Sequence, residues 1–220
     1  MERYVFRLIK ESGVYQEVFP EREYSFCGSK SFSPDVLARQ GKSVLFVDSK
    51  STVPKIGIRL FDLQSYEDNI HIVAENINKL YKQMHRFERY NPFLDDTSSE
   101  VNDFWGIVIV LEDAYIRRVL YYEEAGRLLK IKEKSDEWEW MITHIKVMSL
   151  YEIERLCLYG KSIIDACGVL NKDDPLGFSF VNGMSNDSNY INGDYNAFCE
   201  RVDNEAMCII KEMINAGLLQ

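Results

Sequence analysis

A long amphipathic repeat at residues 66–87 constrains the fold of this chain more than any other feature. Apolar side chains recur there at intervals of three and four residues, which is the period of a helix that packs one face against a sheet. An apolar segment precedes it at residues 43–49, and another follows at residues 104–111. The second is β-branched and uninterrupted, as in a strand buried on both faces. This alternation predicts an α/β fold built in layers.

The remaining segments extend this plan. Two short extended-looking segments precede residues 43–49, and the three together predict a small antiparallel meander. After the central strand the chain alternates between helix and strand, and a long polar loop then leads to a last helix. The predicted segments are strands at 21–27, 34–39 and 141–148, helices at 114–131 and 151–167, a loop at 171–194 and a helix at 198–213.

Length and composition limit the class of protein. The 220 residues, 46% of them apolar, suffice for one full-sized core or two small ones. No apolar run approaches the roughly 20 residues of a membrane-spanning helix, and no signal peptide is evident, so neither a membrane protein nor a Sec-exported protein is expected. The five cysteines form no CxxC pair and favour a reducing cytoplasm over a zinc site or a disulfide framework. A net charge of −9 means that any contact with nucleic acid must be local.

A tight hairpin is predicted around the dipeptide Gly41-Lys42. A two-residue loop with glycine at its first central position is typical of a type II′ turn. In such a hairpin Gln40 lies opposite Ser43, and this pairing sets the register of the two strands. The flanking segments, residues 34–39 and 43–49, are therefore expected to pair residue by residue.

This register brings three charged side chains to one patch. Asp35 lies directly opposite Asp48, and opposed residues of an antiparallel pair project from the same face with Cβ atoms roughly 4.5–5.5 Å apart. Lys50 emerges on that face, whereas Ser49 points away. A hard cation such as Mg²⁺ would neutralise the two acids, and it commonly also takes phosphate oxygens of a substrate. The patch therefore predicts phosphodiester hydrolysis, with Lys50 orienting the attacking water or stabilising developing charge.

The same residues resemble a known motif. Pro34-Asp35, twelve intervening residues, and then Asp48-Ser49-Lys50 at the end of an apolar strand are similar to the motif of the PD-(D/E)xK nuclease superfamily, which includes restriction endonucleases and Holliday-junction resolvases. The resemblance implies a restriction-endonuclease-like mixed central sheet flanked by helices. It also implies Mg²⁺, for which Mn²⁺ can substitute, bound by Asp35, Asp48 and the carbonyl of Ser49, with Lys50 as the catalytic lysine.

Members of this superfamily often add an upstream glutamate to the site. Glu17, Glu21 and Glu23 all qualify, and Glu21 is the first choice. The resemblance assigns residues 1–150 to a nuclease-like core. Residues 151–220 would form a helical C-terminal extension that packs on this core or supports a homodimer or larger assembly.

The expected function is therefore a Mg²⁺-dependent endonuclease that hydrolyses DNA in restriction, repair or phage defence. Residues 117–134 form the most basic region of the chain and are the candidate for contacts with DNA phosphates. Trp138 and Trp140 are expected to pack in the core at the rim of the next strand rather than to stack on bases.

Two alternatives remain open. One is an RNA-directed or nucleotide-activated nuclease that uses the same residues. The other is a catalytically silent nuclease-like subunit that binds DNA or serves in an assembly, and the net acidity of the chain favours it slightly. A third interpretation assigns the charged patch no chemical role. It is then a surface ion-pair cluster that contributes under about 1 kcal/mol to stability. The buried character of residues 44–47 argues against that reading, because polar groups at the end of such a strand more often serve a site.

Overall fold

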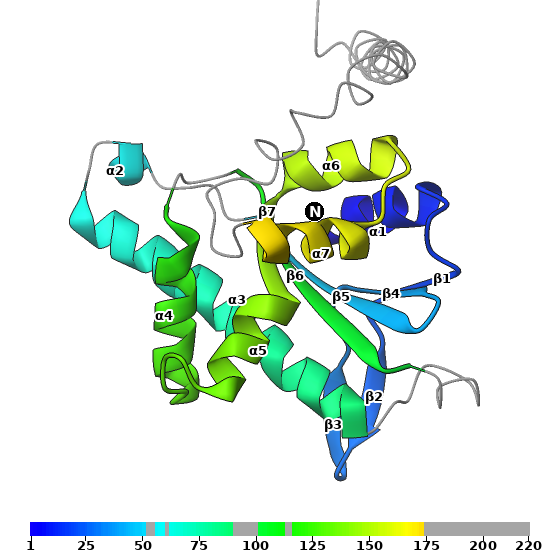
Figure 1. The fold of residues 1–220 in the computed structure, drawn as a ribbon, viewed down its shortest axis with the longest axis horizontal. Helices are drawn as coiled ribbons and strands as arrows, with labels where there is room; N and C mark the ends of the chain where they lie inside the picture. Colours follow the sequence, from blue (N-terminus) through cyan, green and yellow to red (C-terminus); the bar gives the residue numbers. More distant parts are fainter. Residues whose placement is uncertain (52–55, 60–61, 90–100, 113–115, 174–220) are drawn as a thin grey trace, which may run out of the picture. The chain divides into compact units, whose positions relative to one another are not determined.

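The computed structural model describes residues 1–51, 56–59, 62–89, 101–112 and 116–173. A five-stranded sheet with the order β1-β4-β5-β6-β7 forms its centre (Figure 1). β1, β4 and β5 are antiparallel, whereas β5, β6 and β7 are parallel, so the sheet is mixed, as predicted. Its strands are β1 (Glu17–Pro20), β4 (Val36–Gln40), β5 (Ser43–Lys50), β6 (Asp103–Val110) and β7 (Ile145–Ser149).

Helices flank this sheet, which confirms the predicted α/β class. One cluster of buried apolar side chains joins the sheet to α3 (Leu63–Arg89), α4 (Arg118–Leu129) and α5 (Asp136–His144). α1 (Glu2–Glu11) contacts β4 and β5, and α6 (Leu150–Leu158) contacts β6 and β7. α7 (Ile163–Asp173) packs on α6, and the short α2 (Ile56–Arg59) contacts α3. No described helix is long and apolar enough to cross a membrane.

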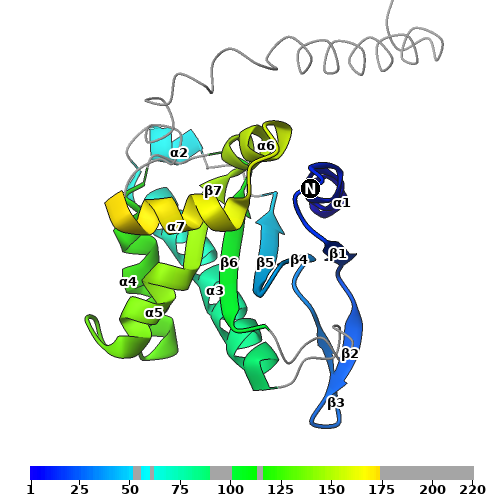
Figure 2. The same ribbon diagram turned by 45° about the vertical axis from the view of Figure 1, so that its right-hand side comes forward.

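A separate hairpin extends away from the main sheet (Figures 1 and 2). It consists of β2 (Glu23–Phe26) and β3 (Ser29–Phe32), which pair only with each other among the described strands. The predicted meander is therefore wrong in its first strand, because residues 23–26 pair with β3 in this separate hairpin and do not join β4 and β5. The strand that does pair with β4 is β1, which lies earlier in the chain and was not predicted.

The hairpin between β4 and β5 has the predicted register. Gln40 pairs with Ser43, and the ladder continues to Val36 opposite Val47. Gly41 has a φ of 61°, a left-handed conformation that suits glycine at the first central position of a type II′ turn. Residues 44–47 are fully buried, as expected for a strand covered on both faces.

Two predicted segments differ from the structure. The strand expected at residues 141–148 begins only at Ile145, because the preceding residues complete α5. The Ser135 hydroxyl caps that helix by accepting a hydrogen bond from the backbone of Trp138, and acidic residues fill its first turn. The helix expected at residues 151–167 is divided into α6 and α7 at Gly160, whose φ of 59° interrupts the helical conformation.

The described residues all belong to one compact unit. α6 begins directly after β7, at the boundary predicted between core and extension, and it packs on strands of the core. The division into residues 1–150 and 151–220 stays a prediction. Residues 174–220, with most of the predicted loop and the last predicted helix, lie outside the described residues.

Candidate functional site

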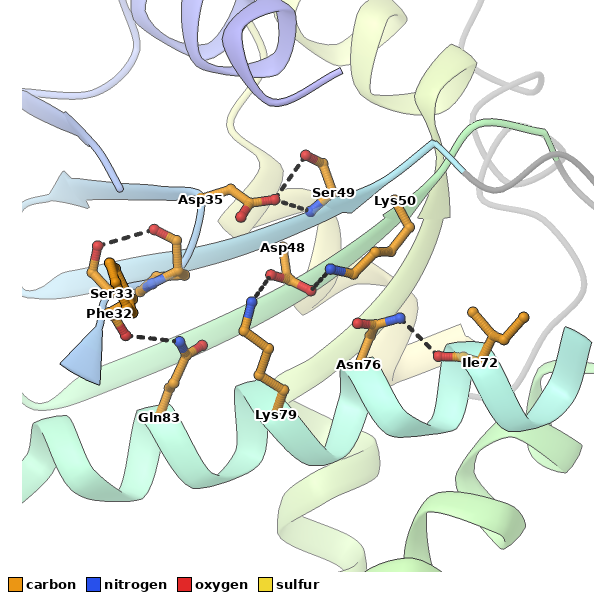
Figure 3. A network of polar contacts seen from close by, with 11 residues as sticks. Phe32, Ser33, Asp35, Asp48, Ser49, Lys50, Ile72, Asn76, Lys79 and Gln83 are labelled. Atoms are coloured by element: carbon orange, nitrogen blue, oxygen red, sulfur yellow. Dashed lines mark hydrogen bonds and ion pairs between the residues drawn. The ribbon is translucent and has the colours of Figure 1, made fainter. Parts of the chain in front are cut away.

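Asp48 is the centre of the candidate site (Figure 3). It lies near the end of β5, and none of it is exposed to solvent. Lys79 of α3 donates a hydrogen bond to Asp48 Oδ1 at 2.6 Å, and the ammonium group of Lys50 lies 3.3 Å from Oδ2. A buried carboxylate is costly unless it is paired, so these two lysines account for its presence in the core.

Asp35 is held by a different partner. β4 begins one residue later, so β5 continues past its last partner in β4. There the Asp35 Oδ2 accepts hydrogen bonds from the backbone N–H of Ser49 at 2.7 Å and from its hydroxyl at 2.9 Å. Burial raises the pKa of Asp35, the backbone hydrogen bond from Ser49 opposes this rise, and the charge of Asp48 adds to it.

The two aspartates therefore do not form the predicted common patch. The ladder of β4 and β5 stops at Val36 opposite Val47, one residue before the predicted pair, and the two carboxylates do not face a common centre. Figure 3 shows the Asp35 carboxylate beside Ser49 and the Asp48 carboxylate on the side of β5 that faces α3. Asp48 and Lys50 do share one face, as predicted. Among the described residues, no group of three or more His, Cys, Asp or Glu side chains could hold a metal ion.

The chemistry of the oxygen atoms nevertheless fits a hard cation. Oδ2 of Asp48 is buried and has no hydrogen-bond donor among the described residues, so its described partner is the ammonium group of Lys50. Asp35 would add a further oxygen ligand only after leaving Ser49, and the backbone carbonyl of Ser49 is the other oxygen that the motif implies. Mg²⁺ usually takes one or two carboxylates and keeps several waters, so a site without a third acidic side chain is sufficient for it.

Lys79 is the site residue that the sequence analysis missed. It belongs to a row of polar side chains, Asn76, Lys79 and Gln83, that follows α3 at helical spacing toward β5 (Figure 3). Burial alone would lower the pKa of Lys79. The hydrogen bond and charge of Asp48, with the charges of Asp35 and Glu21, outweigh burial and raise it. The regular spacing of these polar residues beside the apolar stripe was the available signal.

The three candidate glutamates lie in different surroundings. Glu17 forms an ion pair with Arg39 at 2.8 Å, and Glu23 forms one with Lys30 at 2.6 Å. Glu21 is exposed in the turn between β1 and β2. Its negative charge is one of those that raise the pKa of Lys79, so it acts electrostatically on the site.

A pair of hydrogen bonds positions this turn. The backbone N–H of Arg22 donates to the Ser33 hydroxyl at 2.8 Å, and the backbone N–H of Ser33 donates to the Arg22 carbonyl at 2.9 Å. Ser33 is buried and lies two residues before Asp35. The turn that carries Glu21 is thus fastened to the segment that carries Asp35.

A small cavity borders Lys50. It has a volume of about 10 Å³, and its lining includes Asn69, Asn76 and Tyr121. This volume is close to the minimum for one water molecule, and the polar lining offers hydrogen-bond partners to it. Lys50 therefore stands between a buried carboxylate and a space that suits a single water.

Two further predictions concern the basic region proposed for DNA contacts and the packing of Trp138. Arg118, in the basic region proposed for DNA phosphates, is buried in an ion pair with Glu152 at 3.2 Å and is not available for DNA. Contacts of the remaining basic residues with DNA stay a prediction. Trp138 is buried, as predicted, although it packs from a helix rather than from the rim of a strand.

Comparisons with known proteins add little to this description. No protein-family model matches the chain, and no curated protein matches it. Among solved structures, the small subunit of a heterodimeric restriction endonuclease is similar with a TM-score of 0.42 and 10% sequence identity, over 78% of this chain and 76% of that chain. The likeness is one of coarse architecture, a mixed α/β fold, and it says nothing about activity.

Proposed function

We propose that this protein is a Mg²⁺-dependent endonuclease that hydrolyses phosphodiester bonds of DNA. The observation that carries the proposal is Asp48, a fully buried carboxylate with an ammonium group at each of its oxygens. Burying charged groups in this way is expensive even when they are paired. Such clusters gather at functional sites more often than in purely structural cores.

Each residue of the motif has a distinct role in this proposal. Asp48 and Asp35, with the Ser49 carbonyl, would hold the ion, for which Asp35 must give up its hydrogen bonds with Ser49. Mg²⁺ would supply Lewis acidity, which lowers the pKa of a water and offsets phosphate charge. Lys50, half-buried beside a water-sized cavity, would orient the attacking water or stabilise charge on the phosphate. Glu21 would contribute negative charge near the ion.

The ammonium groups of Lys50 and Lys79 would supply local positive charge at the site of an otherwise acidic chain. Their side chains are 34% and 39% exposed, so both are accessible from solvent. A phosphodiester could therefore meet local positive charge at the site despite the net charge of −9. Restriction, repair and phage defence all require this reaction, and the proposal concerns the reaction rather than the pathway.

A catalytically silent subunit is the second candidate, and one observation favours it. In this structure both acids already have partners within the chain, Asp48 two ammonium groups and Asp35 the backbone and hydroxyl of Ser49. Such an arrangement could persist as a structural remnant of a nuclease site. The protein would then bind DNA or a partner subunit without cleaving DNA.

Cleavage of plasmid DNA in the presence of Mg²⁺ separates the two candidates. The wild type should cleave, and Asp48→Asn and Lys50→Met should each lose at least about 100-fold in rate. Lys42→Met is the matched control, because it removes an exposed lysine at the opposite end of β5 and should retain activity. An RNA substrate assayed in parallel tests the choice of nucleic acid. An inactive wild type that still binds DNA would refute the enzyme and support the silent subunit.

A further inference from the structure

Lys79 gives Asp48 a positive partner from outside the hairpin. Of the two ion pairs that Asp48 forms with described residues, the one with Lys79 is the shorter, 2.6 Å against 3.3 Å for Lys50, and it is also a hydrogen bond. Lys79 approaches from α3, 31 residues away in the sequence. The chain therefore supplies its own cation to the carboxylate where the proposed function requires a metal ion.

The side chain of Lys79 is flexible enough for this contact to form and to break, although its backbone is fixed. Its neighbours Ile77, Leu80 and Met84 are buried in the main core, so the backbone of α3 is held in place. The side chain itself is 39% exposed and consists of a flexible four-carbon stem with a charged end. The ammonium group can thus turn toward solvent without any movement of the helix.

The contact between Lys79 and Asp48 is both an ion pair and a hydrogen bond, with 2.6 Å between the ammonium nitrogen and Asp48 Oδ1. The ammonium group therefore occupies the side of the carboxylate that faces α3. Any other cation that binds Asp48 must therefore share the carboxylate with this ammonium group or displace it.

We propose that Lys79 is the resident counter-ion of Asp48 and competes with a divalent cation for this carboxylate. The inference rests on the proposed function, because it takes Asp48 as a ligand of the cation. When the cation binds, the Lys79 ammonium group moves away from Asp48 and becomes available to an oxygen of a phosphate group. The buried carboxylate exchanges one ionic partner for another and is never left unpaired.

The test measures cation binding rather than cleavage. Isothermal titration of the full chain with MnCl₂ should show that Lys79→Met binds Mn²⁺ at least about tenfold more tightly than the wild type, because the variant has no ammonium group to displace. Lys42→Met removes the same charge about 20 Å away along β5 and should bind Mn²⁺ like the wild type. Asp48→Asn should abolish the binding in both backgrounds, which places the bound ion at this carboxylate.

Each outcome has a separate meaning. Equal or weaker Mn²⁺ binding by Lys79→Met than by the wild type overturns the competition and leaves the proposed metal site intact. No binding by the wild type or by any variant overturns the metal site, and the competition with it. Lys79→Gln, which keeps a hydrogen-bond donor for Asp48 but no charge, must give the same tightening, and thermal melting of both variants verifies that they are folded.

Discussion

Lys146 allows a quantitative test of how much a buried charge lowers the free energy of unfolding of this protein. It lies in β7 and is only 2% exposed, and its ammonium group donates a hydrogen bond to the Ile142 carbonyl at 2.5 Å. Burial, opposed by the charge of Cys167 and assisted by that of Arg118, lowers the pKa of Lys146 from 10.5 to about 8. The ammonium form is therefore destabilised in the folded protein relative to the unfolded chain.

The size of this effect follows from the pKa difference. A difference of about 2.5 units corresponds to roughly 3 kcal/mol at pH 7, where the lysine is charged in both states. Lys146→Met removes this charge with a side chain of similar length. It also removes one hydrogen bond, which offsets about 1 kcal/mol of the gain. The free energy of unfolding should therefore rise by about 2 kcal/mol at pH 7.

The pH dependence has a definite sign. Between the folded pKa of about 8 and the unfolded value of 10.5, the unfolded chain binds more protons, so the wild type gains stability as the pH rises. The advantage of Lys146→Met should shrink by about 1 kcal/mol between pH 7 and pH 9. Burial raises the pKa of Cys157 and Cys167 to about 12. At higher pH these thiols ionise more readily in the unfolded chain, which lowers the free energy of unfolding of both proteins.

Urea denaturation of both proteins, followed by circular dichroism at pH 7, 8 and 9, measures these differences. Lys42→Met is the control, because an exposed lysine should show neither the gain nor its pH dependence. The reasoning is refuted if Lys146→Met is less stable than the wild type at pH 7. It is also refuted if the difference between the two proteins does not change with pH.

Three further substitutions test the packing around the sheet. Gly106→Ala places a methyl group 2.8 Å from the Met84 sulfur and should cost roughly 1–3 kcal/mol in urea denaturation, whereas a neutral effect would contradict the close approach of α3 to β6. Ser149→Ala removes the N-cap of α6 and should lower the free energy of unfolding by about 1 kcal/mol, and an unchanged melting temperature would count against the cap. Tyr122→Phe removes a buried hydrogen bond to the Ile145 carbonyl at 2.8 Å and should also cost about 1 kcal/mol, measured by the same denaturation.

The short-range features of the site could be predicted because neighbouring residues determine them. The Gly41-Lys42 turn sets the register of β4 and β5, and a shift of one residue would turn every side chain to the other face. The alternation of side chains along β5 predicted that Asp48 and Lys50 share a face, which the structure confirms. The amphipathic period predicted α3 for the same reason, since its apolar stripe is continuous in the sequence.

Errors arose where a local pattern had two interpretations or was too short. The two apolar positions that anchor α1, Val5 and Ile9, are fully buried, but two residues are too few to predict a helix. The predicted strand at 141–148 included the last turn of α5, because a short apolar run suits either element. Boundaries of this kind depend on what the segment packs against.

The sequence by itself determined the α/β class, the hairpin and the motif that ends in Asp48-Ser49-Lys50, because each depends on residues close together in the chain. Only the tertiary structure decided the partners of the two acids. Asp48 pairs with Lys79 because α3 packs against β5, and Asp35 turns to Ser49 because β4 begins only at Val36, so that β5 extends beyond its last partner in β4. Such contacts depend on the distance and rotation between separate elements. A periodic pattern shows which face of an element is buried, but not which residue of another element it meets.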